Sequence, residues 1–360
     1  MSDDAVPALS VLHVVTRNQR RGAEASAMEL ADRLTRLGQH SRVVALSPTG
    51  VGASLSAEVL GQSTLGPRTL WRLRRRLRGA DVAVAHGSRT LPAVGIAGFG
   101  LRTPTVYQNI GDPHYWASSP LRRWRVRHLL GRMAGVAALT DSLASVLVDE
   151  FGVSADRVTV VPNWRDGEHF RPPSPEERSA AREQLGVPPG QRVVAMVGAL
   201  SVEKAVDLAV ATVALLPGTL LLVAGDGPER TALEELAART APGQVRFLGP
   251  LGDVRPLLQS ADAFLLTSRS EGVPGALIEA GLSGLPAVTT DVGFVHDVVL
   301  AGETGWVVPT AEPTALAAAL REAEREGEAR GLAARQHCLG RFDSRRVTDV
   351  WLTLLRSVAR

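Results

Sequence analysis

The sequence predicts an α/β protein built from two doubly wound halves, each a parallel sheet covered by helices. Short β-branched runs alternate along the chain with helical stretches of ten or more residues, a pattern typical of parallel βαβ units. The pattern breaks once, at the segment 161–178 with its four prolines, and then restarts. At 360 residues the chain also exceeds one ordinary core and suits two domains.

The first half begins with an apolar run at residues 9–15, LSVLHVV, which predicts a buried strand. The amphipathic stretch 23–38 predicts a helix that ends at Gly38. Further strands are expected at residues 41–47, 81–87, 103–109, 135–140 and 157–163. We therefore expect a first domain over residues 1–165.

The second half restarts with the strand run 191–200 and a helix over about residues 206–216. Further strand runs are expected at residues 219–228, 245–251, 261–268, 285–293 and 305–310. These elements predict a second domain over residues 166–342. The amphipathic segment 344–360 predicts a terminal helix, which we expect to return to the first domain from residue 343 onward.

Bulk properties exclude several classes of protein. No run is long and apolar enough to span a bilayer, and the first ten residues lack the cationic start and apolar core of a secretory signal. We therefore expect a cytoplasmic protein. Cys338 stands alone, so an internal disulfide is excluded. No zinc-type spacing or nucleic-acid motif is present, so we expect neither a metal site nor a nucleic-acid partner.

The segment Ser268 to Gly275 follows an expected strand, where ligands of such sheets bind. Gly272 and Gly275 allow the backbone to approach a ligand closely, and Pro274 is expected at the first position of a helix. The start of that helix, with its unpaired N–H groups, suits a diphosphate.

Two glutamates belong to this segment. Glu271 precedes the helix and can accept hydrogen bonds from a hydroxyl-rich group, while Glu279 can accept both hydroxyls of a ribose. The alternative is structural, with Glu271 as a helix-cap acid and Glu279 as a partly exposed helix residue. The spacing alone does not decide between the two interpretations.

The stretch E-G-V-P-G-A-L-I-E resembles the E-x7-E motif of the retaining glycosyltransferases of family 4. The likeness extends over nearly the whole chain, including the segment G-x-x-x-x-x-K from Gly198 to Lys204. It implies the GT-B architecture, in which two Rossmann-like domains face each other across a cleft. It also implies metal-independent transfer of a sugar from a nucleotide diphosphate sugar with retention of configuration. A UDP-sugar is the expected donor, and no other cofactor is implied.

The resemblance implies roles for individual residues. Glu279 would bind the ribose, Glu271 the hydroxyls of the donor sugar, and Lys204 the phosphates. Backbone N–H groups would meet the diphosphate or sugar, and the base would lie near Leu248. The remaining implied donor contacts are Gly272, Val273, Pro274, Gly275, Gly198 and, in the first half, Gly22.

The sequence departs from the family pattern at three places. Ala199 stands where the family has an arginine, and Phe294 follows Gly293 where a second glycine is usual. His296 stands near the position of a later acid. Because a departing diphosphate needs more positive charge than Lys204 supplies, we expect Arg21, or failing it Arg20, to provide the charge that Ala199 lacks.

Three first-half features remain. The loop 109–116 lies where the family has a histidine on the donor sugar, so Asp112 and His114 are candidates, with plain surface as the alternative. His86 ends a strand and can be structural. The basic stretches 71–79 and 121–132 contain tryptophan; they are either solvated helix faces or a peripheral contact with an anionic membrane.

The expected function is therefore glycosyl transfer to a small-molecule, glycan or lipid acceptor that the sequence does not identify. Two alternatives stay open at this point: a GT-B nucleotide-sugar epimerase and a non-catalytic protein that binds a sugar nucleotide.

Overall fold

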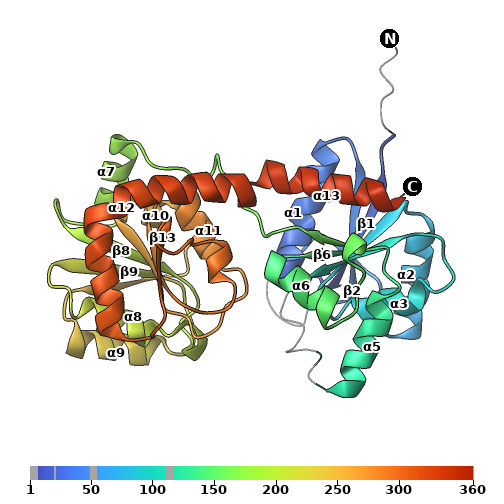
Figure 1. Ribbon diagram of the computed structural model, residues 1–360, viewed down its shortest axis with the longest axis horizontal. Coiled ribbons are helices and arrows are strands. Elements are labelled where there is room, and N and C mark those ends of the chain that lie inside the picture. The colour runs from blue at the N-terminus through green and yellow to red at the C-terminus, as the bar shows by residue number, and fades with distance from the viewer. Residues whose placement is uncertain (1–6, 20–21, 49–54, 111–116, 118, 360) are drawn as a thin grey trace, which may run out of the picture. The chain divides into compact units, whose positions relative to one another are not determined.

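The computed structural model describes residues 7–19, 22–48, 55–110, 117 and 119–359 of the chain. These residues form two compact units, the first comprising residues up to Pro162 together with Val347 onward, the second Asn163–Arg346. The C-terminal helix therefore belongs to the first unit although it is last in the sequence (Figure 1).

The first unit is built on a seven-stranded sheet with the order β3-β2-β1-β4-β5-β6-β7, in which every pairing is parallel. Its strands are β1 (Ser10–Arg17), β2 (His40–Ser47), β3 (Glu58–Val59), β4 (Val82–His86), β5 (Thr105–Asn109), β6 (Gly135–Ala138) and β7 (Val158–Val160). Its helices are α1 (Gly22–Arg36), α2 (Pro67–Arg78), α3 (Leu91–Ala97), α5 (Pro120–Leu130), α6 (Asp141–Asp149) and η1 (Ala155–Arg157), and α13 (Ser344–Ala359) joins them.

The second unit has a six-stranded parallel sheet with the order β10-β9-β8-β11-β12-β13. Its strands are β8 (Arg192–Val197), β9 (Thr219–Ala224), β10 (Val245–Gly249), β11 (Ala263–Leu266), β12 (Ala287–Thr290) and β13 (Gly305–Val308). Its helices are α7 (Pro175–Gln184), η2 (Val202–Lys204), α8 (Val206–Val213), α9 (Arg230–Thr240), α10 (Arg255–Ser260), α11 (Gly275–Leu282), η3 (Val295–Asp297) and α12 (Pro313–Phe342).

The predicted fold class, two parallel-sheet Rossmann-like units, is confirmed. Each strand expected from the sequence is present, and β3, with two residues, is the addition. The helix expected over residues 206–216 is shorter, because α8 ends at Val213 before Pro217 and Gly218, whose φ is +81°. Among the described residues, no helix is long and apolar enough to cross a membrane.

In each sheet, the order in which successive strands are added reverses at one place. In the first, chain order reverses between the neighbouring strands β1 and β4; in the second it reverses between β8 and β11. The loops that leave the carboxyl ends of such a strand pair diverge and leave a crevice, which is where open α/β sheets bind ligands. The two crevices define where functional residues should be sought.

Candidate functional site

In the second unit, the crevice between β8 and β11 brings Lys204 and Glu271 into contact. Lys204 lies in η2 after β8, and Glu271 lies in the loop after β11. Lys204 Nζ is 2.7 Å from Glu271 Oε1, and the Glu271 side chain is only 8% exposed. Because burying a carboxylate to this extent is costly without a partner, the contact with the lysine compensates the burial of the glutamate.

The backbone around Lys204 is held in an unusual conformation. Ala205 has a φ of +45°, the left-handed region that favours glycine. The Thr267 hydroxyl contacts the carbonyl oxygens of Lys204 and Ala205, at 3.1 and 2.9 Å. This buried threonine at the end of β11 fixes the turn that directs Lys204 towards Glu271.

The loop that carries Glu271 is braced by its neighbours. Ser268 Oγ donates to Glu271 Oε1 at 2.6 Å, and Asn163 Nδ2 donates to the Val273 carbonyl at 3.2 Å. A Cβ on Gly293 would lie 1.8 Å from the Glu271 carbonyl oxygen, so glycine is required there. His296, near the place of the family's acid, instead pairs with Asp291 at 2.8 Å.

Helix α11 begins one residue later than the sequence predicts. Its first helical residue is Gly275, and Pro274 is the N-cap with φ −72° and ψ 115°. The expectation that Pro274 takes the first helical position was wrong, because its ψ is extended. Since proline has no N–H, backbone donation to a ligand from residues 272–275 would come from Gly272, Val273 and Gly275.

Glu279 lies one turn into α11 and is paired with a residue that the sequence analysis missed. Arg165 Nε is 2.5 Å from Glu279 Oε1, and the Glu279 side chain is 14% exposed. The partner explains why a carboxylate is tolerated among the buried Leu277, Ile278 and Ala280. No pattern in the sequence links the two residues; in the structure a Cβ on Gly275 would lie 2.1 Å from Arg165 Nη2, so the glycine leaves room for the guanidinium.

The loops after β8 and β9 are interlocked by glycine. A Cβ on Gly225 would lie 1.8 Å from the Gly198 carbonyl oxygen, and Gly227 is similarly close to Leu200. Ala199 is exposed between them, so the position of the family's arginine carries no charge. Leu248 is half-buried on the edge strand β10. The end of β10 is joined to the loop after β9, because the Gly225 N–H donates to the Gly249 carbonyl.

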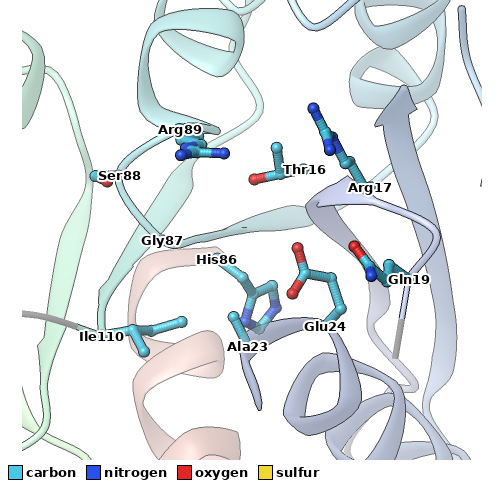
Figure 2. A pocket seen from close by; sticks show the side chains of 10 residues that line it. All are labelled: Thr16, Arg17, Gln19, Ala23, Glu24, His86, Gly87, Ser88, Arg89 and Ile110. Atoms are coloured by element: carbon cyan, nitrogen blue, oxygen red, sulfur yellow. The ribbon is translucent and has the colours of Figure 1, made fainter. Parts of the chain in front are cut away.

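In the first unit, the crevice between β1 and β4 holds a cavity of about 290 Å³ (Figure 2). Thr16 and Arg17 come from the end of β1, and Ser88 and Arg89 follow β4. Glu24, in the first turn of α1, also lines it. The remaining lining residues are Gln19, Ala23, His86, Gly87 and Ile110. Arg17 and Arg89 are exposed, and within the described ranges neither forms an ion pair.

His86 contributes to this cavity from a buried hydrogen-bond chain. Its Nε2 is 3.0 Å from His13 Nδ1 and its Nδ1 is 2.5 Å from Gln108 Oε1, while His13 Nε2 is 2.9 Å from Ser41 Oγ. Burial lowers the pKa of His86 to about 4 and that of His13 well below its usual value. With both ring nitrogens occupied, His86 is a neutral structural residue of the cavity wall.

Four residues of the first-half loops lie outside the described residues: Arg20, Arg21, Asp112 and His114. Gly22 is the first residue of α1. In the part of the chain that is described, no three His, Cys, Asp or Glu side chains gather in an arrangement that could hold a metal ion.

Comparison with known families matches both halves of the chain. Residues 20–169 match the Glycosyltransferase Family 4 model, and residues 177–336 match the model of Glycosyl transferases group 1. The fold and the E-x7-E site thus define a GT-B glycosyltransferase architecture. The chain belongs to glycosyltransferase family 4, as its sequence motifs predict.

Individual relatives agree with this membership. The D-inositol 3-phosphate glycosyltransferase of Nocardia farcinica is 33% identical over 254 residues, 66% of this chain and 52% of that protein. The lipopolysaccharide core biosynthesis glycosyltransferase LpsE of Rhizobium meliloti is 32% identical over 180 residues, 49% of this chain and 53% of that protein. The matches span about half the length of these relatives.

Solved structures share the fold. HepE from Anabaena, in complex with UDP and glucose, has a TM-score of 0.81 at 22% identity, covering 97% of this chain and 100% of that one. Sucrose-phosphate synthase from Thermosynechococcus elongatus has a TM-score of 0.76 at 19% identity, covering 97% and 98%. At such identities the likeness establishes the fold.

Proposed function

We propose that this protein transfers a sugar from a nucleotide diphosphate sugar, held by the second unit, to an acceptor held by the first, with retention of configuration and without a metal. The observation that carries the proposal is the pairing of Lys204 with Glu271 at the start of α11, with Glu279 one turn further along. Family membership and the UDP-bound HepE neighbour support a UDP-sugar as the donor.

The chemistry follows from the charges at this site. When the bond from the anomeric carbon to the β-phosphate oxygen breaks, the diphosphate leaves with added negative charge. Lys204 Nζ and the N–H groups at the start of α11 stabilise that charge. Lys204 can serve both partners, since an ammonium group has three donors and Glu271 accepts only one of them. Glu271 then accepts hydrogen bonds from the hydroxyls of the sugar.

The cavity of the first unit supports an acceptor that combines hydroxyl groups with an anionic group. Arg17 and Arg89 offer positive charge, while Glu24, Thr16 and Gln19 offer partners for hydroxyls. The names of two relatives, an inositol phosphate glycosyltransferase and a lipopolysaccharide core enzyme, favour the same class of acceptor. Asp112 and His114 stay candidates for the donor sugar.

A peripheral membrane contact is a further part of the proposal. Five large apolar side chains of the first unit have exposures of 52% to 68%, and we call them the exposed apolar surface. They are Trp71 on α2, Ile96 on α3, Phe99 just after α3, and Leu121 and Trp124 on α5. Helix α3 packs against both α2 and α5, so the three helices are neighbours in the first unit (Figure 1). Exposed apolar side chains among arginines are typical of an interface with anionic lipid.

The test is a binding screen followed by turnover. Nucleoside diphosphates and their sugars should raise the melting temperature, because ligands that bind the folded state stabilise it. The bound sugar nucleotide is then incubated with polyols that carry phosphate, and the configuration of the product is read by NMR. A chain that binds no nucleotide would overturn the proposal. Conversion of the sugar nucleotide without acceptor would indicate the epimerase, and binding without any turnover the non-catalytic alternative.

A further inference from the structure

Arg165 is fixed in position at both its backbone and its side chain. Its N–H donates to the Phe342 carbonyl and its carbonyl accepts from the Ser344 N–H, each at 2.9 Å. Its Nε donates to Glu279 and its Nη1 to the carbonyl of Trp164 at 2.8 Å. Nη2 makes no hydrogen bond to any residue that the structure describes. The guanidinium is thus held by two nitrogens and presents the third.

The presented nitrogen lies at the start of α11. Nη2 is 2.1 Å from the point where a Cβ on Gly275 would lie, so the missing side chain of that glycine makes room for it. A cation at the positive end of a helix is opposed by the helix dipole. Glu279 offsets this cost, but a placement chosen for stability alone would avoid it.

Arg178 shows what a purely structural arginine in this unit is like. It has the same 33% exposure as Arg165 and the same 2.5 Å separation from its carboxylate partner, Asp262. Its Nη1 also contacts the carbonyls of Gln259 and Ala261, so both terminal nitrogens are used. This cluster directly precedes β11, at the end of the strand opposite to the loop of Glu271.

The family's arginine is missing from the donor site. Ala199 is exposed and uncharged, and Lys204 shares its ammonium with Glu271. We propose that Arg165 supplies the second positive charge to the diphosphate of the donor, with Nη2 donating to a phosphate oxygen while Nε keeps Glu279 directed to the ribose. This inference rests on the proposed function and adds to it a residue of the second unit that lies outside the E-x7-E motif.

The test compares the dissociation constants of a nucleoside diphosphate, its monophosphate and the nucleoside, with UDP, UMP and uridine as the first set. Arg165→Gln should weaken UDP binding by roughly 10- to 100-fold, because a charged hydrogen bond to phosphate is lost. Uridine binding should fall by a smaller factor, about threefold, because Glu279 remains to hold the ribose although it loses the Nε donor that directs it. Arg178→Gln is the matched control; it should lower the melting temperature and leave the ratio of UDP to uridine affinity unchanged.

Gly275→Ala gives a second route that keeps the charge. The added Cβ displaces the guanidinium, so the selective loss of UDP affinity should recur without loss of an arginine. This variant decides the matter if Arg165→Gln fails to fold. Equal losses for all three ligands in both variants, or no loss at all, would reduce Arg165 to a structural clamp while leaving the proposed function intact. If the wild-type protein binds no nucleoside diphosphate, the proposed function itself fails.

Discussion

At the scale of single residues, the two glutamates of the E-x7-E motif have different cation partners, so substitutions at the two positions should have different effects on binding and turnover. Glu279 is paired with Arg165, so Glu279→Gln removes an acceptor from the ribose and the partner from the arginine. The expected loss of nucleotide affinity is about 1–3 kcal/mol, measured as the dissociation constant of the best nucleoside diphosphate. Unchanged affinity would remove the ribose role.

Glu271→Gln should spare the nucleotide and slow the transfer. The substitution releases Lys204, whose ammonium stays available to the phosphates, while the sugar loses its charged acceptor. Affinity for the free diphosphate should change little, and turnover should fall by roughly ten- to a thousand-fold. Turnover at the wild-type rate on the true donor would contradict this assignment.

Ala205 carries a measurable strain. Its φ of +45° costs a residue other than glycine on the order of 1–2 kcal/mol. Glycine avoids this strain, but it loses more conformational entropy on folding, which offsets part of the gain. Ala205→Gly should therefore stabilise the protein by up to about 1 kcal/mol, measured by urea denaturation. The matched control is Ala214→Gly, at the end of α8 with φ −57°, which should destabilise. Stabilisation by both variants would refute strain at Ala205 as the cause.

At the scale of elements, the strands and the two halves followed from the sequence because parallel strands buried on both faces appear as continuous apolar runs. The partners of Glu271 and Glu279 illustrate the limit. Lys204 was identified because its loop belongs to the adjacent strand and to a known motif. Arg165 lies 114 positions from Glu279, in the proline-containing segment 161–178 where the strand and helix pattern breaks, and only the three-dimensional path of that segment brings the two together. The short β3 has too few residues for a pattern.

The structure separates the arginines of the two basic stretches into those that bond within the fold and those that are exposed. Arg74 donates to the carbonyls of Ala97 and Phe99, and Arg123 pairs with Glu150, so these two arginines serve the fold. Arg75 and Arg125 are exposed beside Trp71 and Trp124.

Membrane binding by the exposed apolar surface can be tested with vesicles. Trp71→Ser and Trp124→Ser, combined with Arg75→Gln and Arg125→Gln, should abolish sedimentation with anionic vesicles, while the wild type should bind and be released by high salt. The control replaces Arg239 and Arg325, exposed arginines of the second unit, and should sediment as the wild type does. Absence of wild-type binding at low salt would leave the surface as a solvated face.

At the scale of the whole molecule, stability should fall in mild acid because of two buried histidines. His13 and His86 join β1 to β4, and their hydrogen-bonded neighbours Ser41 and Gln108 are uncharged. The pKa of His86 is lowered to about 4 and that of His13 is also lowered, chiefly by burial. In the unfolded chain both should titrate near pH 6.5. Between these values the unfolded state binds more protons, so stability is present above about pH 6.5 and is lost as the pH falls.

When the pH falls from 7 to 5.5, each of the two histidines should lower the free energy of unfolding by about 1 kcal/mol. Ordinary carboxylates stay largely ionised in this range. Urea denaturation at the two pH values measures this difference. His86→Gln should lower stability at pH 7 and reduce the loss on acidification by about half. His40→Gln, which removes an exposed histidine at the start of β2, should leave the loss unchanged. If the His86 variant loses as much stability in acid as the wild type, the buried pair is not the cause of the pH dependence.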